Sequence, residues 1–216
     1  MVKSKSSVLL IACIALFFAG CVAEKKITGL KEFNGWMKEP KNGLTMSRSV
    51  NGMIITVSYL TPEYNALKEM EAEGYKGKVT YDSLLAYYKT TASFIMTLAP
   101  DESKNNNGDI MYKGLKNFKE YVERAMSLNF DLENQVTLEA DANIYAPSLS
   151  SLDNTYSLST DRKVNFVFTP VNKKEELENA THYNFVYRDE QFDLGTLHFY
   201  FDKKNIEKNL PEISIP

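Results

Sequence analysis

Cysteine and histidine are the scarcest of the chemically versatile residues in this chain. Only two of its 216 residues are cysteine and only two are histidine, His182 and His198. Cys13 and Cys21 both lie near the amino terminus, so the chain from Val22 onward has no thiol. That part can form no disulfide, no thiolate metal site and no cysteine nucleophile. It must therefore stabilise itself through an apolar core, for which 44% hydrophobic residues are sufficient.

The common catalytic and nucleotide-binding motifs are missing as well. The chain contains no G-x-S-x-G elbow, no S-x-x-K, no P-loop and no G-x-G-x-x-G. Its two histidines have no H-E-x-x-H spacing, and a zinc site needs three or four ligands. We therefore expect no enzyme activity, no cofactor and no metal.

A short apolar run at the amino terminus is the most informative feature that is present. Lys3 and Lys5 form a positive region, Val8 to Phe18 form an apolar segment, and Ala19-Gly20 supply small residues before a cleavage site. The apolar segment is well short of the ~20 residues that span a bilayer core. The pattern predicts a signal peptide over residues 1–20 rather than a membrane-spanning helix.

The segment Phe18-Ala19-Gly20-Cys21 resembles a lipobox, the processing site of bacterial lipoproteins. Phe18 departs from the usual pattern, in which leucine is common at that position. The resemblance implies cleavage between Gly20 and Cys21 and lipid attachment, with chains such as palmitate, at Cys21. Two or three acyl chains, at about 0.8 kcal/mol per buried CH₂, hold a protein stably on a membrane. An ordinary secretory signal and an uncleaved anchor are the alternatives.

The resemblance also implies a location in the bacterial cell envelope. Val22 is not the aspartate associated with retention in the inner membrane, which favours the outer membrane and leaves the periplasmic or surface face open. Loss of Lys3 and Lys5 lowers the basic residues from 25 to 23 against 28 acidic ones, a net charge of about −5. This mildly acidic balance argues against nucleic-acid binding and against electrostatic adhesion to anionic lipid.

The chain is expected to have three parts. These are a signal peptide over 1–20, a lipidated amino terminus and tether over 21–43, and a single globular domain over 44–216. Within the second part, three apolar residues have the spacing of one helix face: Phe33, Trp36 and Met37. They predict a short helix that docks on the domain.

The first half of the domain is expected to combine a hairpin with helices. Leu44–Val50 and Met53–Leu60 are strand-like runs joined by Asn51-Gly52, which predicts a β-hairpin with a type I′ turn. Thr61-Pro62 predicts one helix start and Thr80 another, because threonine is a good N-cap. A strand is expected over Phe94–Ala99.

A third helix is expected over Tyr112 to Met126, after a polar loop from Asp101 to Asp109. The loop fails the EF-hand template, because serine and glycine would occupy the positions that require aspartate and glutamate. We expect the loop to be exposed. The inward, apolar side of the helix is expected to consist of four residues: Leu115, Phe118, Val122 and Met126.

The second half of the chain has a β pattern. Alternation predicts strands through Leu128, Phe130 and Leu132 and through Val136 and Leu138. Further strands are expected over Val164–Thr169, Tyr183–Arg188 and Thr196–Asp202, with the last two forming a hairpin. The expected class is α+β: an antiparallel, sandwich-like, β-rich C-terminal half with an N-terminal β-hairpin and about three amphipathic helices.

Two features invite a functional reading. Asp189, Glu190 and Asp193 crowd one turn and resemble an acid–base group, although an exposed hairpin connection has the same composition. Thirteen tyrosines and twelve phenylalanines suit a sugar- or protein-binding face, and they equally suit the core of a β-rich protein.

By elimination, the sequence favours a non-catalytic binding or assembly module. It would be held at the membrane through Cys21 and would serve other envelope proteins, as an accessory subunit of a secretion, transport or adhesion system. The alternatives are an anchored hydrolase or carbohydrate-active or carbohydrate-binding protein that uses carboxylates, and a ligand-binding or inhibitor lipoprotein with an aromatic groove.

Overall fold

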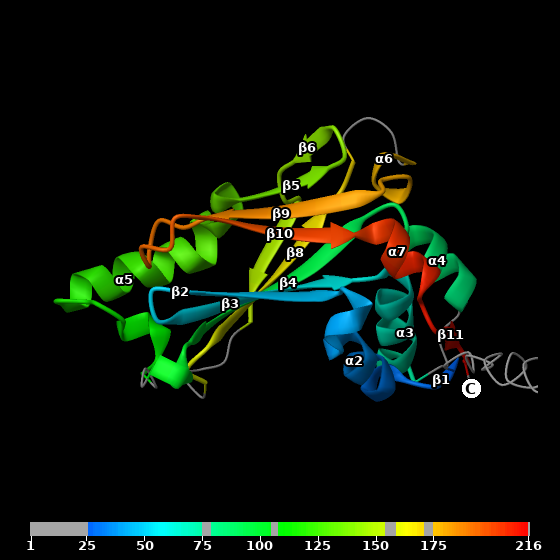
Figure 1. Cartoon of the computed structure of the whole chain (residues 1–216), viewed down its shortest axis with the longest axis horizontal. Helices are drawn as coiled ribbons and strands as arrows, with labels where there is room; N and C mark the ends of the chain where they lie inside the picture. The colour runs from blue at the N-terminus through cyan, green and yellow to red at the C-terminus, as the bar shows by residue number, and fades with distance from the viewer. Residues whose placement is uncertain (1–25, 75–78, 105–107, 154–158, 171–174, 216) are drawn as a thin grey trace, which may run out of the picture.

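The computed structural model describes residues 26–74, 79–104, 108–153, 159–170 and 175–215. The predicted cleavage and lipidation residues, Gly20 and Cys21, lie outside these residues. The fold is α+β: two antiparallel sheets lie against each other, with helices at both ends of the pair (Figure 1). None of the helices in the described ranges has both the length and the apolar composition that a membrane span requires.

The larger sheet has five strands in the order β2-β3-β4-β8-β7, and all neighbours are antiparallel. Its strands are β2 (Thr45–Val50), β3 (Met53–Leu60), β4 (Ala92–Pro100), β8 (Arg162–Phe168) and β7 (Leu149–Leu152). The sandwich therefore draws on both halves of the chain, and the two strands of the expected N-terminal hairpin form part of one of its layers.

The smaller sheet has the order β10-β9-β5-β6 and is also antiparallel. Its strands are β10 (Thr196–Asp202), β9 (His182–Arg188), β5 (Val136–Ala140) and β6 (Asn143–Tyr145). The expected hairpin of β9 and β10 is confirmed. Separately, β1 (Lys26–Ile27) pairs in parallel with β11 (Glu212–Ile213), so the two ends of the described chain lie side by side (Figure 1).

Aromatic rings fill the space between the two sheets. Phe94 of β4 lies at their centre, and its ring centroid is 5.3 to 6.0 Å from five others: Tyr59, Phe168, Tyr183, Phe185 and Phe201. Tyr59 and Phe168 come from the larger sheet, and the other three come from the smaller one. Much of the aromatic content is thus core, where such pairs contribute ~1 kcal/mol beyond their buried area.

The hairpin of β2 and β3 forms as its turn residues predict. Val50 pairs with Met53, and Asn51 and Gly52 between them have φ values of 48° and 71°. Both residues of a type I′ turn need positive φ, which asparagine and glycine adopt most readily. One face of β3 is buried, and it consists of Met53, Ile55, Val57 and Tyr59.

Two helices begin at the threonines that predict them. The side chain of Thr61 accepts a hydrogen bond from the backbone N–H of Tyr64, and that of Thr80 accepts one from Ser83. These residues cap α3 and α4. The helices are α2 (Leu30–Lys38), α3 (Pro62–Ala72), α4 (Tyr81–Tyr88), α5 (Phe118–Met126), α6 (Glu175–Glu178) and α7 (Lys203–Lys208).

The segment before the first long strand packs onto the body. The expected docking helix is α2, which buries Phe33, Trp36 and Met37. Ile27 of β1 is also fully buried, and all four side chains belong to the same core cluster. Residues 26–43 are therefore part of the packed body, and only residues 22–25 separate it from Cys21.

The helix expected over 112–126 is present only from Phe118 to Met126, and the strand expected through Leu128 to Leu132 is wrong. Gly114 takes φ 70° after a 3₁₀ turn, η4 (Ile110–Tyr112), and the helix starts only where the Asn117 side chain accepts the N–H of Glu120. The chain then continues through a π turn, η5 (Ser127–Asp131), and a 3₁₀ turn, η6 (Leu132–Gln135). Leu128 and Leu132, four positions apart, are buried on one side of these turns, whereas Phe130 between them is 67% exposed.

The expected exposure of the loop after β4 is wrong at its first residue. Asp101 is buried because its carboxylate accepts hydrogen bonds from the hydroxyls of Ser49 and Ser103 and lies 3.6 Å from Lys104 Nζ. Hydrogen bonds from Ser103 and Ser49 lower the pKa of Asp101. Asn105, Asn106 and Asn107 lie outside the described residues.

Gly52→Ala should lower the free energy of unfolding by about 1 kcal/mol, because alanine is strained at φ 71°. Gly35→Ala is the matched control. It lies inside α2, where a Cβ meets no described atom within 4 Å, so it should raise stability by about 0.5 kcal/mol. Urea denaturation of both variants measures the two effects, and equal effects would contradict the turn assignment.

Candidate binding surface

Helix α5 turns its apolar side toward solvent instead of toward the core. Phe118, Val122 and Met126 are 77%, 42% and 54% exposed, although the sequence predicts them as the inward side. Tyr112 before the helix and Phe130 after it are 62% and 67% exposed. We call these five side chains the α5 surface. Contiguous exposed apolar side chains of this kind mark interaction sites more often than chance.

The members of the α5 surface from Phe118 onward lie in one row. Phe118, Val122 and Met126 are spaced by four, which places them on one face of the helix. The π turn η5 holds more residues per turn than an α-helix, so it rotates Phe130 back toward that row. The result is an apolar row longer than α5 itself.

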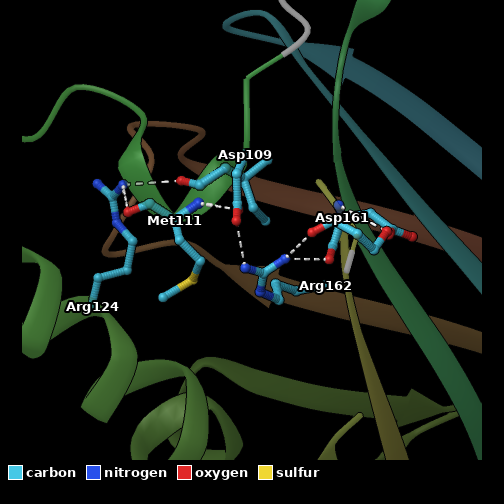
Figure 2. Close-up of polar contacts among 7 residues, drawn as sticks. Asp109, Met111, Arg124, Asp161 and Arg162 are labelled. Atoms are coloured by element: carbon cyan, nitrogen blue, oxygen red, sulfur yellow. Dashed lines mark hydrogen bonds and ion pairs between the residues drawn. The ribbon is translucent and has the colours of Figure 1, made fainter. Parts of the chain in front are cut away.

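A buried arginine holds α5 in this orientation. Arg124 lies on the opposite side of the helix and is 6% exposed. Its guanidinium donates hydrogen bonds to the carbonyls of Ile110 and Met111 (Figure 2). It also donates to the carbonyls of Lys113 and Gln191, so four backbone carbonyls accept from it. It also lies 4.6 Å from the ring centroid of Phe192. Burial lowers the pKa of Arg124, whereas Asp189 and Glu120 act in the opposite direction.

A second arginine fixes the segment that Arg124 binds. Arg162 Nη2 is 2.8 Å from Asp109 Oδ2, and the other oxygen of Asp109 accepts the N–H of Met111 at 2.9 Å (Figure 2). Arg162 Nη1 donates to the carbonyls of Ser159 and Asp161. The η4 segment is therefore held from both sides, by Arg162 through Asp109 and by Arg124 through its carbonyls.

The acidic turn of the β9–β10 hairpin completes this support. Asp189 accepts hydrogen bonds from the hydroxyl of Tyr187 and from three backbone N–H groups, those of Gln191, Phe192 and Leu194. These bonds use the carboxylate to shape the turn, which presents the carbonyl of Gln191 and the ring of Phe192 to Arg124. Asp189 thus has a structural role, in contrast to the acid–base reading of this turn.

The amino-terminal end of α5 is hollowed. The hollow has a volume of ≈ 560 Å³. It is lined by Tyr112, Leu115, Lys116, Asn117, Phe118 and Tyr121. The Tyr121 ring lies between two others, 5.2 Å from Tyr112 and 5.9 Å from Phe118, with interplanar angles of 20° and 16°. Stacked rings of this kind hold their exposed neighbours in place.

The α5 surface lies far from the ends of the described chain. Figure 1 shows α5 at one end of the body and β1, α2 and the carboxyl terminus at the other. The two sandwich sheets lie between them. A body attached through its amino terminus would therefore present α5 on the side away from the attachment.

A second, polar pocket lies near the other end of the body, with a volume of ≈ 370 Å³. Its lining includes three carboxylates, those of Glu63, Glu178 and Glu207, and the two lysines Lys89 and Lys203. Buried Lys203 Nζ is 2.6 Å from Glu207 Oε1 and donates to the carbonyl of Glu178. Burial raises the pKa of Glu63 above its ordinary value of 4.5.

The two histidines do not come together. His182 pairs with Asp202 and His198 with Val186, so they lie four positions apart along the hairpin. Asp141 accepts the N–H of His182, and His198 Nδ1 lies 3.1 Å from Asn184 Nδ2. Within the described ranges, no group of three or more His, Cys, Asp or Glu side chains is arranged to hold a metal ion.

Comparison with known proteins leaves the family open. No family model and no curated protein matches this chain. A solved structure, a novel protein of unknown function from Burkholderia pseudomallei K96243, aligns with a TM-score of 0.37 and 10% identity over 84% of this chain and 93% of that chain. A similarity this low carries no argument about function.

Phe118→Ser should leave the free energy of unfolding within about 0.5 kcal/mol, because the side chain is 77% exposed. Phe192→Ser should cost about 3 kcal/mol or more, because that ring is 4% exposed and lies against Arg124. Urea denaturation separates the two. A large loss of stability in Phe118→Ser would mean that the α5 surface serves folding rather than binding.

Proposed function

We propose that this protein is a membrane-anchored lipoprotein of the bacterial cell envelope. Its body is a non-catalytic binding or assembly module for other envelope proteins, as an accessory subunit of a secretion, transport or adhesion system. The observation that carries the proposal is the α5 surface, an exposed apolar row on a rigid support. The absence of aspartate after Cys21 favours the outer membrane.

The length of chain before the body supports a directed arrangement. Cys21 and Lys26 are five residues apart, which an extended chain spans in at most about 18 Å. A lipid at Cys21 would keep the β1 end of the body close to the membrane. The α5 surface lies at the opposite end and would be directed away from it (Figure 1).

The composition of the α5 surface suits a protein partner. Tyrosine, phenylalanine and methionine are enriched at the cores of protein interfaces, and charged residues surround such cores. Exposed Lys119 and Glu123 lie beside the apolar row and form an ion pair at 3.6 Å. The mixed signs fit a protein partner better than an anionic lipid surface, which would favour lysine and arginine alone.

The anchor and the surface are tested in the same cells. The wild-type chain should incorporate labelled fatty acid and remain in the membrane fraction, and Cys21→Ala should do neither, because its side chain cannot form the thioether. Crosslinking should join the wild type to another envelope protein. Phe118→Ser should lose that product, because it removes an apolar contact that is 77% exposed.

Ile144→Ser is the matched control for the surface, since Ile144 lies on β6 and is 70% exposed. It should retain the crosslinked product. Labelling of Cys21→Ala with fatty acid would refute the anchor. If the chain from Val22 onward stays monomeric and no envelope protein is captured in cells, the binding role has no basis.

A second candidate, an anchored carboxylate-dependent hydrolase or carbohydrate-active protein, is favoured by the polar pocket. The pocket brings together Glu63, whose pKa burial raises, and Glu207, which is ion-paired with Lys203. Two carboxyl groups in different environments can serve as general acid and general base. Glu63 would supply the proton and Glu207 would act as the carboxylate.

Glu63→Gln tests this candidate through activity and stability together. Because burial raises the pKa of Glu63, wild-type stability should fall as pH rises above 4.5 through the folded pKa, where a buried carboxylate must ionise. The variant should avoid this loss and unfold at higher urea than the wild type at pH 7. Any hydrolysis of polysaccharides by the wild type should be abolished in the variant. Activity that survives in Glu63→Gln excludes this site.

A further inference from the structure

We infer that the α5 surface binds a second copy of this chain, with the two α5 helices antiparallel about a twofold axis level with Tyr121. The inference rests on the proposed function only in using the same surface, and it names one partner for it. A twofold contact uses the same patch on both copies, so the patch must be complementary to itself.

The charges beside the apolar row meet that requirement. Lys119 and Glu123 lie on the same flank of α5, and their side chains are 85% and 61% exposed. A twofold axis level with Tyr121 lies midway between them along the helix. It therefore places Lys119 opposite the partner subunit's Glu123, and Glu123 opposite the partner subunit's Lys119.

The apolar side chains interdigitate under the same axis. Each residue rises by about 1.5 Å along a helix, so Val122 lies about 1.5 Å beyond the axis and Phe118 about 4.5 Å before it. Phe118 then falls between Val122 and Met126 of the partner subunit. Phe130 extends past the helix toward the end of the partner where the hollow beside Phe118 lies.

The distribution of charge along the segment selects the antiparallel direction. Lys116 and Lys119 are exposed at the amino-terminal end, whereas Glu123 and Asp131 are exposed toward the carboxyl-terminal end. An antiparallel pair sets the basic end of one copy against the acidic end of the other. A parallel pair would set like charges together, which is unfavourable.

The contact leaves the attachment end of the body free. The α5 surface lies at the end opposite β1, α3 and α7 (Figure 1). The proposed pair therefore covers neither β1 nor the polar pocket, whose lining includes Glu63 of α3 and Glu207 of α7. Two chains attached through Cys21 could therefore still pair through their α5 surfaces, because the attachment lies at the other end of each body.

The test is a charge swap followed by sedimentation velocity. The chain from Val22 to Pro216, which contains the whole described body, should form dimers whose fraction rises with concentration. Lys119→Glu or Glu123→Lys alone should raise the dimer dissociation constant about tenfold, because each replaces two attractions with two repulsions. The double variant, with both changes, should restore dimerisation to near the wild-type level.

Two further variants separate packing from charge. Phe118→Ser should raise the dissociation constant by about 100-fold, because it removes two central rings from the contact. Ile144→Ser on β6 should leave it unchanged. Circular dichroism of each variant checks that the helix content is retained.

The outcomes are distinct from those of the proposed function. A wild type that is monomeric at all concentrations, or a double variant as weak as the single ones, overturns the inference. If the wild type is monomeric and Phe118→Ser loses a crosslink to another envelope protein, the proposed function is supported and the dimerisation inference is refuted. A dimer that captures no other envelope protein supports the inference and removes that partner from the proposed function. If the wild type is monomeric and co-sediments with phospholipid vesicles, the α5 surface binds lipid instead.

Discussion

The buried guanidinium of Arg124 is the interaction on which the α5 end of this molecule depends. A buried charge is costly unless its donors are paired, and here four carbonyls from two separate segments accept its hydrogen bonds. Those carbonyls belong to the η4 segment and to the β9–β10 turn, so the arginine joins α5 to both. Since one side of a short helix is committed to these bonds, the side with Phe118 and Val122 must face outward. Exposure of the apolar row is therefore a consequence of how the helix is anchored.

The sequence predicts those elements of the fold whose cause is local. Asn51-Gly52 determines a turn through its own φ preferences, and Thr61 caps a helix through a bond to a residue three positions away. The alternation in β3, β9 and β10 likewise identifies the buried side of each strand. That the larger sheet joins strands from the two halves of the chain does not follow from such signals, because strand order depends on pairings between distant segments.

The candidate site could not be predicted from the sequence either, because it also depends on contacts between distant segments. The spacing of Phe118, Val122 and Met126 marks one face of a helix, and apolar spacing alone does not say whether that face meets the core or a partner. The deciding contact joins Arg124 to Gln191, 67 positions later in the chain. The burial of Asp101 is similar, because its partner Ser49 lies on another strand. Arginine inside an otherwise amphipathic segment is a weak hint, since most arginines on helices are solvated.

The parallel pairing of β1 with β11 has a mechanical consequence. In the proposed lipid-anchored state, drag and partner forces would act as tension at the amino terminus, and that tension would enter the described body at Lys26. There the two-residue strand pairs with Glu212 and Ile213, and the carbonyl of Ile27 accepts the N–H of Ser214. Directly behind it, the fully buried Ile27 and Phe33 must leave the core before α2 can detach. Such a load would be shared between β1 and β11 before it reached the two sheets that support α5.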